Sequence, residues 1–192
     1  MNTVIRKAAS AESDSIASLI FLAMEDIVYY FIGEGSRDNA IQFLSSLIRE
    51  TNNQYSFENC WVIEADNKIV AAALVYNGAD LDALRKPVLE KIKLEYNRDL
   101  NLENETEPGE YYIDCIGVDP AHQGKGMGSK IIAFLIEEFV GKQNETLGLL
   151  VDKNNPGAKR LYLKSGFAIV GEKKLAGKEM EHLQFRKQLP LT

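Results

Sequence analysis

The most informative stretch of the chain is Val118-Asp119-Pro120-Ala121-His122-Gln123-Gly124-Lys125-Gly126-Met127-Gly128-Ser129. It joins an apolar run that is typical of a strand to an amphipathic run that is typical of a helix. Three glycines at every second position remove side chains where the backbone has to come close to something else. Successive N–H groups can then point into one concavity at the positive end of the helix dipole. The stretch therefore predicts a phosphate or pyrophosphate site, against the alternative of a glycine-rich turn that binds nothing.

The spacing of the glycines excludes two common phosphate loops. A P-loop requires G-x-x-x-x-G-K-[ST], but position 119 is Asp and position 126 is Gly. A dinucleotide-binding turn requires G-x-G-x-x-G after the first strand, but position 129 is Ser and the stretch comes late in the chain. The pattern that fits is Q-x-x-G-x-G, formed by Gln123, Gly126 and Gly128.

A second motif follows, with the sequence Asn155-Pro156-Gly157-Ala158-Lys159-Arg160-Leu161-Tyr162-Leu163-Lys164-Ser165-Gly166-Phe167. Asn155 is suited to cap a helix, Pro156 to occupy its first position and Gly166 to end it. The pattern reads N-x-x-A-x-x-L-Y-x-x-x-G-F. The two motifs stand in order with a strand and a helix between them, and over residues 111–170 the sequence resembles the GCN5-related N-acetyltransferases.

The resemblance implies direct transfer of an acetyl group from acetyl-coenzyme A to an amine, without a metal ion. It also implies that backbone groups of the strand bind the pantetheine arm and that the glycine loop binds the pyrophosphate. The residues that it assigns to the coenzyme are Ile116, Gly117, Val118, Gln123, Gly124, Lys125, Gly126, Met127, Gly128, Ser129 and Asn155. Lys125 is also compatible with a solvated loop lysine, and Asn155 with a helix cap alone.

Two residues are candidates for the chemistry. Tyr162 stands where the family has its general acid, and the alternative is a core tyrosine that packs beside Leu161. Asp114 lies in an apolar strand, where a lone carboxylate is costly to bury unless it is paired or functional. The resemblance implies a base on this strand, so Asp114 is the candidate. A structural, ion-paired Asp114 is the alternative, and Glu110 or a water molecule would then be the base.

The pattern along the whole chain predicts an α/β fold with one mixed sheet, in a single domain over residues 1–192. Apolar runs predict strands at residues 4–5, 61–65, 68–76, 111–118, 147–151, 167–170 and 181–187. Helical periodicity appears at residues 16–28, 41–48, 80–97, 129–140 and 155–166. The resemblance adds that the sheet is mostly antiparallel and flanked by helices, and that a helix and loop are inserted at about 78–109. We expect residues 52–59 to form a loop and residues 101–109 to be exposed or mobile.

Composition and charge exclude several classes of function. The chain has 192 residues with 22 Lys+Arg and 28 Asp+Glu, giving a formal net charge of −6, which disfavours binding to nucleic acid. A signal peptide and a run of 18 apolar residues are both lacking, so we expect a cytoplasmic protein that is not in a membrane. Cys60 and Cys115 are expected to be buried free thiols, and His122 and His182 lie far apart in the sequence, which disfavours a histidine-based metal site.

The acceptor is not specified by the sequence. A small-molecule or peptide amine is the expected partner, and a homodimer is compatible with the sequence. Residues 24–37 contain both aromatic and acidic side chains, which could form an acceptor pocket or could pack as a helix end: Glu25, Asp26, Tyr29, Tyr30, Phe31 and Glu34. A non-catalytic sensor of acyl-coenzyme A is the alternative function, and it would not need Tyr162.

Overall fold

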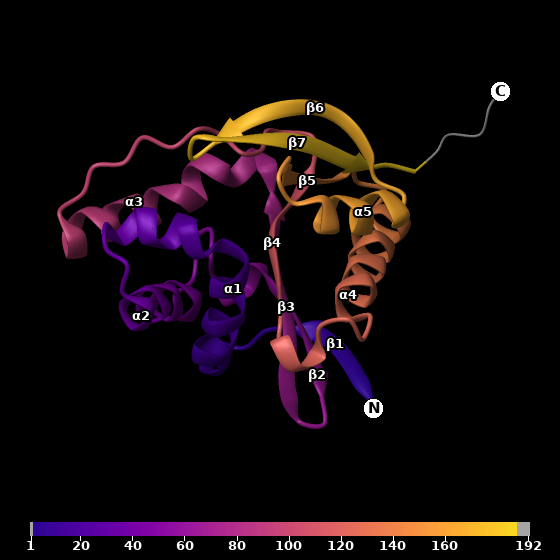
Figure 1. The fold of residues 1–192 in the computed structure, drawn as a ribbon, viewed down its shortest axis with the longest axis horizontal. Coiled ribbons are helices and arrows are strands. Elements are labelled where there is room, and N and C mark those ends of the chain that lie inside the picture. Colours follow the sequence, from indigo (N-terminus) through magenta and orange to yellow (C-terminus); the bar gives the residue numbers. More distant parts are fainter. Residues whose placement is uncertain (1, 188–192) are drawn as a thin grey trace.

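The computed structural model describes residues 2–187 and is built on one seven-stranded sheet in the order β1-β2-β3-β4-β5-β7-β6 (Figure 1). The strands are β1 Thr3–Lys7, β2 Cys60–Ala65, β3 Lys68–Asn77, β4 Tyr111–Val118, β5 Leu147–Asp152, β6 Ala168–Leu175 and β7 Lys178–Phe185. Neighbouring strands run antiparallel except β4 and β5, which are parallel. The predicted mixed, mostly antiparallel sheet is therefore confirmed.

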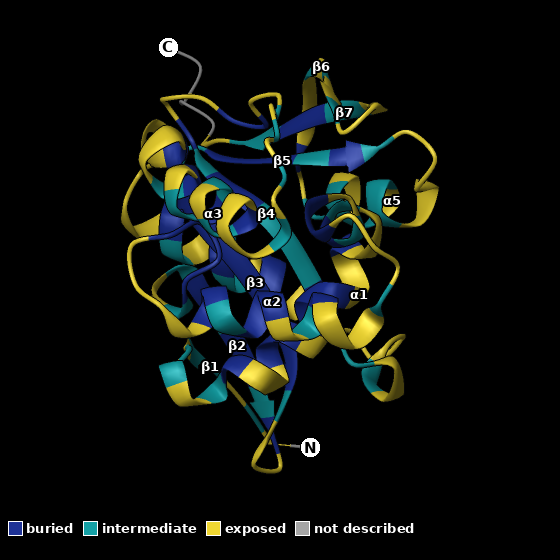
Figure 2. Ribbon diagram, turned by 90° about the vertical axis from the view of Figure 1, so that its left-hand side faces the viewer, coloured by how far each residue is buried: buried dark blue, intermediate teal, exposed yellow. Residues whose placement is uncertain are grey.

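Helices cover both faces of the sheet, so that its central strands are buried on two sides (Figure 1). One face carries α1 Ser13–Ile32, α2 Arg37–Arg49 and α3 Leu81–Tyr96, and the other carries α4 Met127–Leu135 and α5 Pro156–Lys164. Two separate apolar clusters result, one on each face. Strand β3 lies between them and is buried over residues 70–76 (Figure 2). Helix α4 continues as a π-helical turn, Ile136–Lys142, and so extends past residue 140, where the predicted helix ends.

Short-range signals in the sequence explain where elements begin and end. Asp66 and Asn67 both have positive φ angles, 48° and 62°, and they form the tight turn between β2 and β3, in the two-residue gap between the strands predicted at 61–65 and 68–76. Asn155 caps α5 by accepting a hydrogen bond from the N–H of Ala158 at 3.0 Å. Gly166 follows the end of α5 with a φ of 97°, as expected for a glycine that terminates a helix.

Strand β4 contains one residue more than its partner β3 requires. Cys115 pairs with Leu74 and Ile113 pairs with Val75, so Asp114 is the extra residue of a β-bulge. On its other side, β4 pairs with β5 only over residues 111–113. The two parallel strands are no longer paired beyond that point, and the backbone of β4 from Asp114 onward lacks a strand partner on the β5 side.

The segments at 52–59 and 101–109 are more ordered than their polar composition predicts. Residues 53–56 are buried, and a short helical turn, Phe57–Asn59, follows them. In the second segment Glu105 and Thr106 are 5% and 1% exposed, so the expectation that residues 101–109 are all exposed is wrong. The reason is that their polar groups find protein partners, and a buried polar group is stable when it is hydrogen-bonded.

Helix α1 packs unusually close to the sheet. The helical stretch Ser10–Ile32 is long and apolar enough to cross a membrane by length and composition, but half of it is buried inside the molecule. Its apolar face packs against α2, β3 and β4. A Cβ atom on Gly117 of β4 would lie 2.0 Å from the carbonyl oxygen of Leu19, so only glycine permits this approach.

We expect Gly117→Ala to destabilise the fold by about 1–3 kcal/mol, because the added methyl group would have to displace the backbone of α1. Gly171→Ala is the control, since no atom lies within 4 Å of a Cβ placed there and its φ is not in the left-handed region. Chemical unfolding of both variants measures the two effects. Equal unfolding free energies for both would contradict the close packing of α1 on β4.

Candidate active site

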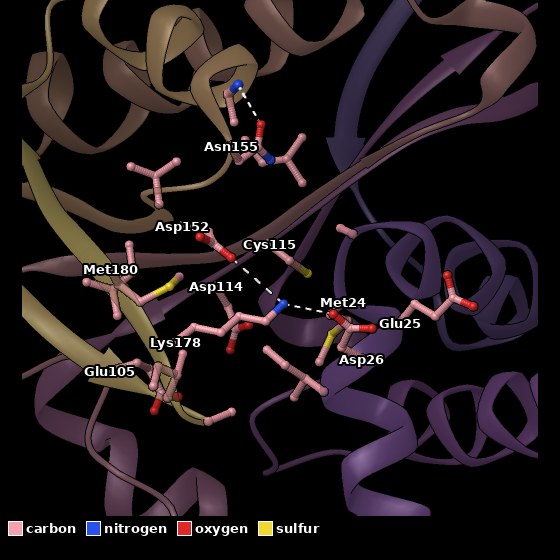
Figure 3. A pocket seen from close by; sticks show the side chains of 18 of the residues that line it. Met24, Glu25, Asp26, Glu105, Asp114, Cys115, Asp152, Asn155, Lys178 and Met180 are labelled. Carbon is pink, nitrogen blue, oxygen red and sulfur yellow. Dashed lines mark hydrogen bonds and ion pairs between the residues drawn. The ribbon is translucent and has the colours of Figure 1, made fainter. Parts of the chain in front are cut away.

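A cavity of about 670 Å³ opens where β4 and β5 cease to pair. Its walls come from α1, β4, β5, α5, β7 and the segments at 54–55 and 102–105. Figure 3 shows that acidic side chains from several of these elements face the same space. The cavity brings together the strand before the glycine loop and the helix of the second motif.

The glycine loop lies beside this cavity and ends at the N-terminus of α4. Gly124 and Gly126 have φ angles of 72° and 81°, and a Cβ on either would meet no atom within 4 Å, so backbone conformation rather than crowding favours glycine there. Gly126 is the N-cap of α4, which leaves the N–H groups of the first turn without helical partners. A second cavity of about 380 Å³ adjoins the loop. Free N–H groups at a helix N-terminus beside a cavity fit a bound pyrophosphate.

The residues expected to bind the coenzyme do not all face the cavities. Asp119 donates its N–H to Val70 of β3 at 2.9 Å, so alternation turns the backbone groups of Ile116 and Val118 toward the unpaired β5 side. Gly117 is buried beneath α1, where its missing side chain serves packing. Met127 buries its side chain in the core and can offer only its backbone.

The polar side chains of the loop differ in their contacts. Gln123 donates from Nε2 to the carbonyl oxygen of Val118 at 3.2 Å, which braces the loop against the end of β4. Gly128 and Ser129 line the second cavity, and Gly128 approaches Leu161 of α5. Lys125 is exposed.

Helix α5 contributes Asn155, Ala158 and Tyr162 to the main cavity. The hydroxyl group of Tyr162 has no hydrogen-bond partner within residues 2–187, and its ring packs edge-on against Phe167. Burial, with a smaller contribution from Cys115, raises the pKa of Tyr162 to about 12. The hydroxyl group therefore keeps its proton at neutral pH and is free to donate it to a ligand.

Asp114 lies in the cavity wall and is held by two side chains. Gln54 donates from Nε2 to its Oδ2 at 2.8 Å, and the hydroxyl of Tyr76 lies 3.2 Å from the same oxygen. Burial raises the pKa of Asp114 above its ordinary value, although the hydrogen bonds from Gln54 and Tyr76 and the charge of Arg85 oppose this rise. The bulge places Asp114 and its neighbour Cys115 both on the cavity.

The fallback base, Glu110, is not in the cavity wall. Its carboxylate is buried and accepts hydrogen bonds from Thr106 at 2.7 Å and Gln184 at 2.7 Å, and His182 Nε2 lies 2.9 Å away. Burial raises the pKa of Glu110, but the hydrogen bonds from His182, Gln184 and Thr106 outweigh it and leave the pKa below its ordinary value. A carboxylate with this many internal partners is a structural group, and the geometry argues against Glu110 as a base.

Two aspartates and one lysine from three different elements meet at the cavity. The Nζ atom of Lys178 on β7 lies 2.8 Å from Asp26 of α1 and 3.8 Å from Asp152 of β5 (Figure 3). Helix α1 has non-helical backbone angles at Met24, and residues 22–27 beside this break line the cavity.

The aromatic and acidic residues of 24–37, which could form an acceptor pocket or pack as a helix end, divide between the cavity and other surroundings. Glu25, Asp26 and Phe31 line the cavity. Tyr29 instead packs against Phe21, and Tyr30 is exposed at the surface, where its ring stacks with Arg98. Glu34 bonds to Asn39 near the start of α2 and lines no part of the cavity.

The expectation about the two cysteines also needs correction. Both are free thiols and Cys60 is buried, but Cys115 is only half-buried, because the bulge at Asp114 turns it toward the cavity. Within residues 2–187 there is no group of three or more His, Cys, Asp or Glu side chains arranged to hold a metal ion.

Several polar cavity residues were not found from the sequence, among them Gln54, Arg85, Glu105, Asp152 and Lys178. Arg85 did leave a signal, because it lies on the apolar stripe of α3 with Leu81, Val88 and Ile92, at spacings of four, three and four. A charged residue on such a stripe needs a buried partner. Its partner is the carboxylate of Glu105, with which it forms a buried ion pair.

Comparison with known proteins decides the family. The model of the acetyltransferase (GNAT) family matches residues 33–167. The chain belongs to this family of acetyltransferases. A solved acetyltransferase structure is 30% identical and superposes with a TM-score of 0.79, covering 96% of this chain and 100% of the other. The fold is also that of an N-acetyltransferase from Staphylococcus aureus Mu50, with 24% identity, a TM-score of 0.84 and coverage of 95% and 100%.

Two curated relatives are similar over shorter stretches. Mycothiol acetyltransferase of Mycobacteroides abscessus is 41% identical over 61 residues, which cover 32% of this chain and 20% of the relative. N-alpha-acetyltransferase RimI of Mycobacterium tuberculosis is 39% identical over 66 residues, which cover 34% of this chain and 40% of the relative. The chain thus matches less than half the length of either GNAT relative, and neither match specifies an acceptor.

Proposed function

We propose that this GNAT protein is an N-acetyltransferase that moves an acetyl group directly from acetyl-coenzyme A to a primary amine of a small molecule or a peptide. One observation carries the proposal: Asp114 on β4 and Tyr162 on α5 line the same cavity, at the point where β4 and β5 cease to pair. A base and an acid on one cavity are what acyl transfer to an amine requires. The two curated relatives, a mycothiol acetyltransferase and an N-alpha-acetyltransferase, support both acceptor classes.

In this proposal the coenzyme binds where β4 has no neighbouring strand and where the first turn of α4 leaves its N–H groups without helical partners. The pantetheine arm takes the place of the missing strand beside the backbone groups of Ile116 and Val118. The free N–H groups of the first turn of α4, together with the loop from Gln123 to Ser129, hold the pyrophosphate. Asn155 keeps its role as the N-cap of α5. Because it also lines the main cavity, it contacts the pantetheine arm from the cavity wall.

The proposed reaction forms a C–N bond and breaks the C–S bond of the thioester. The amine arrives as an ammonium ion and gives a proton to Asp114, which lets its nitrogen attack the carbonyl carbon. The C–S bond then breaks, the nitrogen gives its second proton to the departing sulfur as the amide forms, and the hydroxyl of Tyr162 donates a hydrogen bond to that sulfur. A thiol has a pKa of roughly 8.5, so the thiolate is a weaker base than the Tyr162 phenolate, and donation of a hydrogen bond is the main help that Tyr162 gives.

The charges of the cavity favour a cationic acceptor. Five carboxylates line it, Glu25, Asp26, Glu105, Asp114 and Asp152, against the two cations Arg85 and Lys178. The ammonium group of Lys178 already lies near two of these carboxylates, and the pair that it forms with Asp26 is largely exposed. Exposed ion pairs contribute little stability, so a substrate ammonium can replace Lys178 at small cost.

We further propose that the chain works as one catalytic domain in the cytoplasm and that the segment at 78–109 supplies side chains to the acceptor end of the site. The direct test is a screen of polyamines, aminoglycosides, amino acids and peptide N-termini with acetyl-coenzyme A, read out as release of free thiol. Release with at least one amine class supports the enzyme. Acetyl-coenzyme A binding without thiol release on any amine would instead support the non-catalytic sensor.

We expect Tyr162→Phe to lower kcat by about 10²-fold while leaving the Kd for acetyl-coenzyme A within about twofold of wild type. The change removes one hydrogen-bond donor to the leaving thiolate and keeps the ring against Phe167, and loss of one such donor costs 10²-fold or more. Steady-state kinetics and calorimetry measure the two quantities. Tyr30→Phe, an exposed tyrosine outside the cavity, is the matched control. A kcat equal to wild type would make Tyr162 a packing residue only.

A further inference from the structure

A compact polar cluster lies behind Asp114 and consists of Gln54, Tyr76, Glu105 and Arg85. Glu105 comes from the segment between α3 and β4, and both it and Arg85 are about nine-tenths or more buried. Gln54 donates from Nε2 to Glu105 Oε1 at 2.7 Å as well as to Asp114 Oδ2 at 2.8 Å. The Tyr76 hydroxyl lies 2.9 Å from Glu105 Oε1 and 3.2 Å from Asp114 Oδ2. Two carboxylates therefore share the same amide and the same hydroxyl.

The number of donors in this cluster is too small for two ionised carboxylates. Gln54 Nε2 also lies 3.1 Å from the Tyr76 hydroxyl, so its two amide hydrogens serve at most one contact to each carboxylate. The single hydroxyl hydrogen of Tyr76 can serve Glu105 or Asp114, but not both. One of the two oxygen–oxygen contacts is then left without a hydrogen. A proton on Asp114 completes the cluster, because Asp114 then donates to the Tyr76 oxygen while Tyr76 donates to Glu105.

Arg85 decides which carboxylate stays ionised. Its guanidinium group pairs with Glu105 Oε2 and also donates to the carbonyl oxygens of Leu102 and Glu103 at 3.3 and 3.2 Å and to Asn104 Oδ1 at 3.0 Å. Arg85 thus fixes the segment that carries Glu105 and keeps Glu105 as an anion. Asp114 has no cation in contact, so a proton that enters the cluster goes to Asp114: it is the base while ionised, and it donates to Tyr76 once it has taken the proton of the amine.

We propose that Glu105, held by Arg85, is a positioning residue of the acetyltransferase, which prepares Asp114 to take the proton of the acceptor amine by placing a fixed negative charge behind it. The inference rests on the proposed role of Asp114 as the base and explains what the segment at 78–109 contributes to the site. A general base works best when its pKa lies near the working pH, and a nearby negative charge raises the pKa of a carboxyl group.

Other groups face Asp114 and must be considered in any pH dependence. Tyr55, Tyr76 and Tyr112 surround it, Cys115 follows it on β4, and all four keep their protons at neutral pH because burial raises each pKa. From α1, β5 and β7 the charged groups on the same cavity are Glu25, Asp26, Asp152 and Lys178. None of these four makes a hydrogen bond with Asp114, whereas Glu105 shares two donors with it.

The test is a titration of Asp114 in the folded protein by carbon-13 NMR of side-chain carboxyl groups, with its resonance assigned by the loss of that signal in Asp114→Asn. We expect Glu105→Gln to lower the pH midpoint of Asp114 by about 1 unit. The acid limb of kcat/KM for the best amine should move in the same direction. Glu107→Gln removes an equal charge from the same segment, at an exposed side chain near Lys173, and should change neither midpoint.

A second variant keeps the test decisive if Glu105→Gln fails to fold. Glu105→Gln leaves Arg85 buried without its anion, which can unfold the protein, so Arg85→Met combined with Glu105→Gln removes both charges together. The midpoint of Asp114 should fall in this double variant too, by less, because Glu105 is in closer contact with the cluster than Arg85. An unchanged midpoint in whichever of these variants folds would overturn the proposal. If the midpoint of Asp114 shifts in the Glu105 variants but Asp114→Asn keeps full activity, Glu105 acts on Asp114 as proposed and Asp114 is not the base.

Discussion

Asp114→Asn is expected to lower kcat/KM for the best amine acceptor by about 10²–10⁴-fold, the usual effect of losing a general base. The amide has nearly the shape of the carboxylate and can keep a hydrogen bond with Tyr76, but it cannot accept the proton of the incoming ammonium ion. The loss should be greatest where Asp114 is ionised and the amine still carries its proton, and it should shrink at lower pH, where Asp114 is itself protonated in the wild type. Initial rates of thiol release between pH 5 and pH 9 measure both effects.

The stability of the same variant separates a catalytic Asp114 from a structural one. Burial raises the pKa of Asp114 in the folded state, so its contribution to stability is present below the pKa of the unfolded chain and is lost as the pH rises through the folded pKa. At neutral pH the ionised group costs folding energy. Asp114→Asn should therefore unfold at a Tm equal to or above that of wild type at pH 7.5. A lower Tm with normal turnover per folded molecule would identify a structural aspartate.

Gly126→Asp is expected to weaken acetyl-coenzyme A binding by about 10³-fold. A carboxylate at the N-cap of α4 would stand about 4 Å from the proposed pyrophosphate, where two like charges repel by about 4 kcal/mol at an effective dielectric constant of 20. A Cβ at this position meets no atom within 4 Å, so the side chain has room. Isothermal titration calorimetry with acetyl-coenzyme A gives the change in Kd.

The control for this prediction is Gly126→Asn, which has the same size and the same strain at a φ of 81° but no charge. It should bind acetyl-coenzyme A at least 10-fold more tightly than the Asp variant. Because a negative charge at a helix N-terminus favours the helix, the Asp variant should not unfold more easily than the Asn variant. Equal Kd values for the two variants would mean that the loop does not hold an anion.

Local signals made much of the fold predictable from the sequence. Positive φ angles at Asp66 and Asn67, the cap at Asn155 and the glycine at Gly166 depend on residues a few positions apart, and each appears in the structure where the sequence places it. The glycine loop belongs to the same class, because its conformation is set by Gly124 and Gly126 themselves. The two motifs that lead to the GNAT family are both of this local kind.

The acceptor side of the site depended on contacts that no local pattern contains. Gln54 and Asp114 are 60 positions apart, Arg85 and Glu105 are 20 apart, and Asp26 and Lys178 are 152 apart. The bulge at Asp114 belongs to the register of β4 on β3, two strands that lie between α1 and α4. The polar segment at 101–109 looked like an exposed loop for the same reason: its burial depends on Arg85, which lies on another element.

The sequence by itself determined the turns, the helix ends and the loop proposed to bind the coenzyme, because short-range sterics and hydrogen bonding decide them. The tertiary structure alone decided which charged side chains meet around Asp114, because buried polar groups are stable only where distant parts of the chain supply their partners.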